Sequence, residues 1–168
     1  VPLHHKPSCD AKSLGVPAAG VDDAAQQVFL IALRKIDRIE PGRERAFLLG
    51  TAVGVAANAR RGVSRSKEVA DADALGAGVD PSSNPGQAAI LAERRAIVER
   101  VLDGMPDELR VVFVLFELEG LTSVEIADML AIPVGTASSR LRRAREQFQS
   151  DVQRVITRTP ARALGGQR

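Results

Sequence analysis

The stretch that constrains the fold most is residues 120–148, GLTSVEIADMLAIPVGTASSRLRRAREQF. Thr122 and Glu125 have the T-x-x-E spacing of a capping box, which marks the start of a helix. Pro133 pushes the preceding residue away from helical geometry, so this first helix ends close to Ala131. Apolar residues at helical spacing predict one buried face for it. They are Val124, Ala127 and Leu130.

A second helix is expected from about Val134 onward, with its apolar and basic residues on different sides. The apolar stripe, at spacings of three and four residues, is Ala137, Leu141, Ala144 and Phe148. The polar and basic residues off this stripe are Ser138, Ser139, Arg140, Arg142, Arg143 and Arg145. A short helix, a sharp turn and a basic second helix indicate a helix-turn-helix, whose second helix lies in the DNA major groove. Arginines that form only the solvated face of a helical hairpin are the alternative, but the one-sided charge favours DNA binding.

The positive charge is concentrated at the C-terminal end of the chain. Residues 87–133 contain 4 basic and 9 acidic side chains, whereas residues 134–168 contain 8 basic and 2 acidic ones. The net charge of the whole chain, +2, hides this difference. A basic end beside an acidic body suits a protein that turns one surface toward nucleic acid.

Composition excludes several other classes of protein. Five Phe and no Trp or Tyr leave a core of Ala, Val, Leu and Ile, which favours small helical bundles. Cys9 is the only cysteine, so no internal disulfide forms, and we expect a cytoplasmic protein. No apolar run is long enough to span a membrane. His4 and His5 are the only histidines, and neither a carboxylate pair nor a phosphate-binding loop is evident, so we expect no enzyme, no metal site and no cofactor.

The N-terminal part predicts an irregular arm followed by a helical module. Residues 1–21 are rich in Pro, Gly and Ala and show no periodicity, so we expect them to form the arm. Residues 22–63 are expected to form the module, with a helix that begins at Asp22, a loop around Pro41, and a helix over residues 45–61. The apolar residues at helical spacing in the first helix, which we expect to be buried, are Ala25, Val28, Phe29, Ala32, Leu33 and Ile36.

A linker separates this module from a second one. Residues 64–87 are rich in Ser, Asp, Gly and Pro, which is typical of a flexible linker. Residues 88–150 then predict a helix to about Met105, a helix opened by Pro106 that is apolar nearly all round, and the helix-turn-helix. Residues 151–168 form a basic C-terminal tail. We therefore expect an all-α fold of two small helical modules joined by a flexible linker, with the helix-turn-helix in the C-terminal module.

The motifs in this order resemble those of bacterial sigma-70-family factors of the extracytoplasmic-function (ECF) type. Residues 105–115 resemble the pattern L-P-x-x-x-R-x-V-F-x-L, and residues 120–127 resemble G-[LY]-S-x-x-E-I-A. Residues 132–145 are similar to I-P-x-G-T-V-x-S-R-L-x-R-A-R. In the N-terminal module, residues 22–30 resemble D-A-E-D-L-V-Q-E-V-F-L, and residues 45–49 stand where the family has W-L-[FY]. The family's helix ahead of this module has no counterpart, so we expect the module to be short at its N-terminal end.

The resemblance implies a transcription initiation factor with three kinds of partner: core RNA polymerase, promoter DNA and an anti-sigma factor. Its region 4 would read the −35 element through Thr136, Ser138, Ser139, Arg140, Arg142 and Arg143. Its region 2 would bind the −10 element through Arg43, Arg45, Phe47, Arg60 and Arg61. The polymerase would be held by Asp22, Asp23, Gln26, Gln27 and Phe29. The alternatives are a stand-alone helix-turn-helix regulator and a degenerate sigma paralogue that acts through protein interaction.

Overall fold

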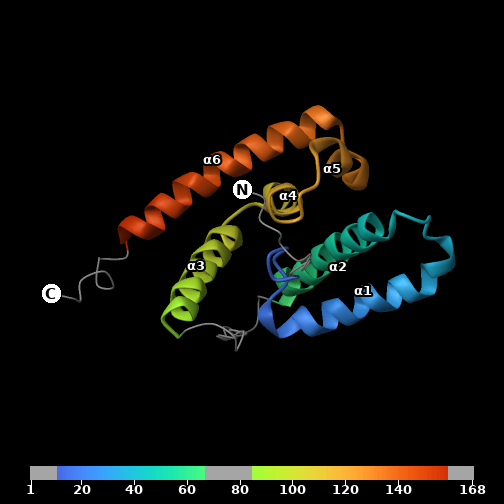
Figure 1. Cartoon of the computed structure of the whole chain (residues 1–168), viewed down its shortest axis with the longest axis horizontal. Coiled ribbons are helices and arrows are strands. Elements are labelled where there is room, and N and C mark those ends of the chain that lie inside the picture. The colour runs from blue at the N-terminus through green and yellow to red at the C-terminus, as the bar shows by residue number, and fades with distance from the viewer. Residues whose placement is uncertain (1–10, 67–84, 159–168) are drawn as a thin grey trace.

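The computed structural model describes residues 11–66 and 85–158 of the chain, and within these ranges it contains helices and no strand (Figure 1). The all-α prediction is therefore confirmed. The elements are η1 (Ala18–Gly20), α1 (Val21–Lys35), η2 (Ile36–Arg38), α2 (Glu44–Ser66), α3 (Pro85–Asp103), α4 (Asp107–Phe113), η3 (Val114–Leu118), α5 (Ser123–Leu130) and α6 (Val134–Arg158). The turn η3 is π-helical and continues α4. None of the helices in the described part of the chain is long and apolar enough to cross a membrane.

Helices α1 and α2 form an antiparallel pair and lie side by side (Figure 1). The side of α1 that packs on α2 contains buried Ala24 and the partly buried Val21, Val28 and Ile31. The expectation that Ala25, Phe29, Leu33 and Ile36 are buried is wrong, because all four are exposed, the last three at 60–66%. Helix α1 carries apolar residues on two sides. Among the described elements, the long helix that packs on it is α2, and the side with Phe29 and Leu33 stays exposed.

Helix α4 is the centre of the C-terminal module, as its all-round apolar sequence predicts. Every residue from Leu109 to Leu115 is buried. Helix α6 packs along α4 and also contacts α3 and α5. In Figure 1, α4 lies between α6 and the pair of α1 and α2.

Residues 11–20 join the two modules. Leu14 and Val16 are only 1% and 2% exposed, and they belong to one apolar cluster with Leu49 of α2 and Leu102 of α3. This part of the expected arm is therefore packed into the core. The two modules share a single core in this structure.

The module boundaries differ from the expected ones by a few residues. Helix α2 continues to Ser66 and α3 begins at Pro85, so both enter the expected linker at its ends. Helix α6 continues to Arg158, which places much of the expected tail in a helix. The rest of the linker, the end of the tail, and His4, His5 and Cys9 lie outside the described residues.

Candidate nucleic-acid interface

The helix-turn-helix begins with the predicted capping box. The amide of Glu125 donates to Oγ1 of Thr122 at 3.3 Å, and the amide of Thr122 donates to Oε2 of Glu125 at 2.7 Å. These two reciprocal bonds satisfy amides that the first turn of α5 leaves free. Ala131 ends α5 in the left-handed conformation, with φ 52°, and Pro133 precedes the first residue of α6. Sequence and structure agree on both ends of the turn.

The apolar stripe of α6 is buried as predicted. Ala137 and Ala144 are 0% exposed and Leu141 is 5% exposed. On α5 the fully buried residue is Ile126, at 0% exposed, and Ala127 lies beside it at 3%. The prediction that Val124 is buried is wrong, because its side chain is 63% exposed. Val124 is in the first turn of α5, at the end farther from the turn to α6.

Four of the six residues predicted to read the −35 element lie together on the exposed side of α6. Ser138, Ser139, Arg142 and Arg143 are exposed and follow one another at positions i, i+1, i+4 and i+5, which is one helix face. Ser139 donates its hydroxyl to the carbonyl of half-buried Thr136 at 3.0 Å. The face therefore combines hydroxyl groups and guanidinium groups within about 8 Å along the helix axis.

The two arginines of this face differ in their surroundings. Arg142 pairs with Glu146 one turn later at 2.8 Å, and both side chains are more than 60% exposed. Such a pair contributes about 0.2–0.5 kcal/mol, so it breaks easily. Arg143 is exposed and makes no hydrogen bond or ion pair with any residue that the structure describes. Both guanidinium groups are available to a ligand.

Acidic residues of the central helix hold two other arginines of α6. Arg140 donates to Oε2 of Glu108 at 2.8 Å, and its side chain is 27% exposed. Arg145 donates to Oε1 of Glu117 at 2.6 Å, and its guanidinium carbon lies 4.8 Å from the ring centre of Phe116. Sequence reasoning placed Arg140 in the DNA-binding set and missed both acidic partners, which are about 30 residues away in the chain.

The residues predicted to bind the −10 element do not form one site. Arg43 and Arg45 lie at the start of α2, and Arg60 and Arg61 lie 15 or more residues later, which is about 22 Å along the helix. Phe47 is half-buried on the same helix. Arg43 pairs with Glu40 at 3.4 Å, and Arg61 donates to the amide oxygen of Asn58.

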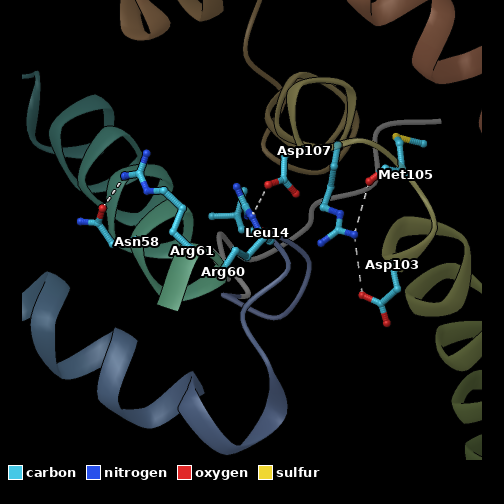
Figure 2. Close-up of polar contacts among 8 residues, drawn as sticks. Leu14, Asn58, Arg60, Arg61, Asp103, Met105 and Asp107 are labelled. Atoms are coloured by element: carbon cyan, nitrogen blue, oxygen red, sulfur yellow. Dashed lines mark hydrogen bonds and ion pairs between the residues drawn. The ribbon is translucent and has the colours of Figure 1, made fainter. Parts of the chain in front are cut away.

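Arg45 and Arg60 both contact the C-terminal module. Arg45 donates to the backbone carbonyl of Glu119 and lies 3.4 Å from its carboxylate. Arg60 forms an ion pair with Asp107 at 2.9 Å and donates to the carbonyl of Leu14, as Figure 2 shows. Neither partner was predicted from the sequence.

A third arginine, Arg110, is buried where the modules meet. Its side chain is 6% exposed, its nearest carboxylate is Asp103 at 4.0 Å, and it donates weakly to the carbonyl of Met105 at 3.5 Å. Burial lowers the pKa of Arg110, and the charges of Asp103 and Asp107 partly offset this effect. In the sequence, Arg110 was one position of a family motif, and nothing indicated that its side chain is buried.

The predicted polymerase-binding residues all lie on the exposed side of α1. Asp22, Asp23, Gln26 and Gln27 are exposed, and the side chain of Phe29 is 66% exposed. Leu33 and Ile36 continue this side at i+4 and i+7 from Phe29. Sequence reasoning assigned Leu33 and Ile36 to the core and so missed that α1 presents an apolar stripe to solvent. Among the described residues, no group of His, Cys, Asp and Glu is arranged to hold a metal ion.

Comparisons with known proteins identify the family to which the chain is similar. The family model for sigma-70 region 4 matches residues 95–148. The ECF RNA polymerase sigma-E factor of Escherichia coli K12 is 35% identical over 153 residues, which cover 85% of this chain and 79% of that protein. The sigma-E factor of Haemophilus influenzae is 30% identical and covers 81% of this chain and 76% of its own length.

Two solved structures share the fold. The sigma factor RpoE of Bartonella quintana, in complex with the anti-sigma factor NepR, superposes with a TM-score of 0.66 at 18% identity and covers 85% of this chain and 87% of its own. CnrH, in complex with the cytosolic domain of CnrY, gives 0.60 at 23% identity over 86% and 79% of the two chains. A sequence match over 85% of the chain must include residues of both modules. The chain therefore belongs to the ECF family of RNA polymerase sigma factors and is a sigma-type transcription initiation factor.

Proposed function

We propose that this sigma factor binds core RNA polymerase through α1 and directs it to promoters through α6, which reads the −35 element. The observation that carries the proposal is the exposed face of α6, where Ser138, Ser139, Arg142 and Arg143 lie together opposite the buried stripe. The role is non-catalytic, because recognition by such a face requires binding and no chemical step. It would be carried out in the cytoplasm, where the polymerase and its promoters are.

The chemistry of α6 suits double-stranded DNA. An arginine can donate two hydrogen bonds to guanine in the major groove, which is worth about 1–3 kcal/mol of discrimination. Contacts to phosphate position the protein without selecting a sequence. We assign base or phosphate contacts to Arg142 and Arg143, and phosphate contacts to Ser138, Ser139 and Thr136 near the start of the helix. Arg140 would contact DNA only by leaving or sharing Glu108.

The exposed side of α1 suits a protein partner. Phe29, Leu33 and Ile36 are each at least 60% exposed, and Leu30 beside them is 53% exposed. Large apolar side chains that gather on one exposed face mark an interaction surface. Asp22, Asp23, Gln26 and Gln27 surround the N-terminal end of this stripe with polar groups, as at the rim of a protein interface.

Helix α2 supplies the residues that we assign to the −10 element. Arg43 directly precedes α2 and Arg61 lies in its C-terminal third, and both are exposed. Phe47, which is half-buried, is the aromatic residue of this helix. An aromatic or guanidinium plane is what an unstacked base needs as a partner. Arg45 contacts Glu119 but its side chain is 55% exposed, whereas Arg60 is 13% exposed in its ion pair with Asp107, so the use of Arg60 on DNA requires that this ion pair opens.

An anti-sigma factor is a further proposed partner. RpoE, which shares the fold, was solved with an anti-sigma factor bound. The likeness supports the same class of partner here, and it does not identify the surface that such a partner would use.

The test is recovery of genomic DNA fragments by the full chain, with and without core RNA polymerase. A sigma factor is expected to recover a defined set of fragments only when polymerase is present. Recovery of the same set without polymerase would identify a stand-alone regulator instead. Double substitution of Phe29→Ala and Leu33→Ala should abolish recovery of polymerase while the protein stays folded, since both side chains are exposed. Unchanged polymerase binding would refute the role of α1.

A further inference from the structure

We propose that the N-terminal end of the exposed face of α6 enters the major groove deepest, where Gly135 lets a base pair approach the helix backbone and Val134 contacts the methyl group of a thymine. The inference rests on the proposed reading of the −35 element by α6. It adds two residues to that site, and neither of them has a polar side chain.

Gly135 lies in the middle of the exposed face of α6. Ser138, Ser139 and Arg142 follow it at i+3, i+4 and i+7, which places all four residues on one side of the helix. Gly135 is exposed, and a Cβ built on it would meet no atom of the described part of the chain within 4 Å. The face that we assign to DNA therefore begins with a position that has no side chain.

The described fold gives no reason for a glycine at this position. Gly135 belongs to α6 and its φ is not positive, so alanine could adopt the same backbone conformation. Glycine destabilises a helix relative to alanine, and it is used where a backbone must approach a ligand closely. Gly54 of α2 is open in the same way, so open space alone does not identify a contact. The position of Gly135 beside Ser138 and Ser139 does.

The side chains of this face lengthen along the helix. Gly135 has no side chain, the next two exposed positions are serines, and the last two are Arg142 and Arg143, over about 12 Å of helix axis. A face that tapers in this way touches a flat surface along its whole length only when the N-terminal end of the helix lies nearest to that surface. The floor of the major groove is such a surface, and a recognition helix reads base edges with its N-terminal residues.

Val134 supplies an apolar side chain at this end of the face. It is the first residue of α6, its side chain is 46% exposed, and it precedes Ser138 by four residues, in the same row. A single exposed valine needs no explanation by itself, but this one lies beside the positions that would read bases. The side chain of valine makes no hydrogen bond, so the feature that it can distinguish in the groove is the methyl group of thymine.

Gly135→Ala tests the close approach by separating binding from stability. Because alanine suits a helix better, this variant should raise the midpoint of thermal unfolding by about 1–4 °C. The added methyl group should weaken binding to promoter DNA at least about fivefold, because it holds the helix away from the base pair. Gly54→Ala is the matched control, since it adds the same methyl group in open space on α2. It should raise the midpoint similarly and change DNA binding by less than about twofold.

Replacement of thymine by uracil tests the contact of Val134, because uracil lacks only the methyl group. The probe is a genomic fragment that the wild-type chain recovers with core RNA polymerase, and each thymine of the shared sequence element is replaced in turn. At one position or more, uracil should weaken binding of the wild-type complex by about fourfold, as expected for the loss of one buried methyl group. The complex with Val134→Ala should bind the thymine and uracil forms of that position equally.

Each part of the inference has results that would overturn it. Unchanged DNA binding by Gly135→Ala, an equal loss with Gly54→Ala, or a lower unfolding midpoint for Gly135→Ala would overturn the close approach. The thymine contact would be overturned by equal losses on uracil replacement in the wild type and Val134→Ala, or by no loss at any thymine.

These failures differ from a failure of the proposed function. If the variants behave in this contrary way while Arg143→Ala still weakens recovery of the fragments, the proposed function stands without this inference. If the wild-type chain and polymerase recover no fragments that share a sequence element, the proposed function and this inference both fail.

Discussion

Phe148 of α6 stacks on Phe113 of α4, with ring centres 4.7 Å apart and ring planes inclined by 25°. Phe113 is 7% exposed, whereas Phe148 is half-buried. Offset aromatic pairs contribute about 0.5–1.5 kcal/mol beyond the area that they bury. The pair attaches the middle of α6 to the central helix, so the rotation of α6, and with it the direction of its basic face, depends on Phe113.

Truncation of this pair should therefore destabilise the whole chain. Phe113→Ala is expected to lower the free energy of unfolding by about 3–5 kcal/mol, as for other large-to-small changes in a core. Phe29→Ala should lower it by less than about 0.5 kcal/mol, because that side chain is 66% exposed. Denaturant unfolding of the full chain measures both values. Similar losses in the two variants would contradict the assignment of Phe29 to an exposed binding surface.

Arg143→Ala and Arg145→Ala, only two residues apart, should have different effects, the first on DNA binding and the second on stability. Arg143→Ala should weaken promoter binding. If Arg143 contacts phosphate, the slope of log K against log salt concentration should fall by about one. If Arg143 contacts guanine, the preference at one base position should relax instead. Arg145→Ala should leave DNA binding nearly unchanged and cost up to about 1 kcal/mol of stability, through loss of Glu117 and the ring of Phe116. Fluorescence titration at several salt concentrations distinguishes them. If Arg145→Ala weakens DNA binding and Arg143→Ala does not, the DNA-binding face has been assigned to the wrong side of α6.

The capping box makes the stability of α5 depend on pH. Hydrogen bonds from the backbone and hydroxyl of Thr122 hold the pKa of Glu125 below its ordinary value of 4.5. A lowered pKa in the folded state means that the contribution is present above about pH 4.5 and is lost as the pH falls through the folded value. The difference in unfolding midpoint between wild type and Glu125→Gln should therefore shrink below pH 4.5. A difference that stays constant between neutral and acidic pH would contradict this. At neutral pH, Thr122→Ala should cost about 1 kcal/mol.

Two glycines with the same backbone conformation provide a matched test of the junction between the modules. Gly15 and Gly42 both have φ +86°, so alanine at either site is strained by about 1–2 kcal/mol. A Cβ at Gly15 would overlap Nη1 of Arg110, whereas a Cβ at Gly42 meets nothing within 4 Å. Thermal unfolding should therefore show a larger loss for Gly15→Ala than for Gly42→Ala. Equal losses would indicate that Arg110 moves away without cost.

Local features of the sequence predicted the helix-turn-helix well. Thr122, Glu125 and Pro133 act on their immediate neighbours, so the start of α5 and the turn follow from residues less than a dozen positions apart. The stripe of Ala137, Leu141 and Ala144 was equally clear, because α6 carries apolar residues on one side only.

Features that depend on distant residues were not predictable in this way. Helix α1 has two apolar sides, and only the position of α2 decides that Ala24 is buried and Leu33 exposed. The partner of Arg45 is 74 residues away, and the carbonyl that Arg60 binds is 46 residues away. Periodicity carries no information about such contacts, so the division of the arginines into exposed and engaged ones needed the structure.

The most direct test of the central claim is transcription from genomic DNA by purified core RNA polymerase, with the full chain added as wild type, Arg143→Ala or Arg145→Ala. The wild type should produce start sites that require the chain and share one upstream sequence element. Arg143→Ala should lose or change these start sites, and Arg145→Ala should keep them. Absence of any start site that depends on the chain, or an identical set of start sites with Arg143→Ala, would contradict the claim that α6 directs the polymerase to promoters.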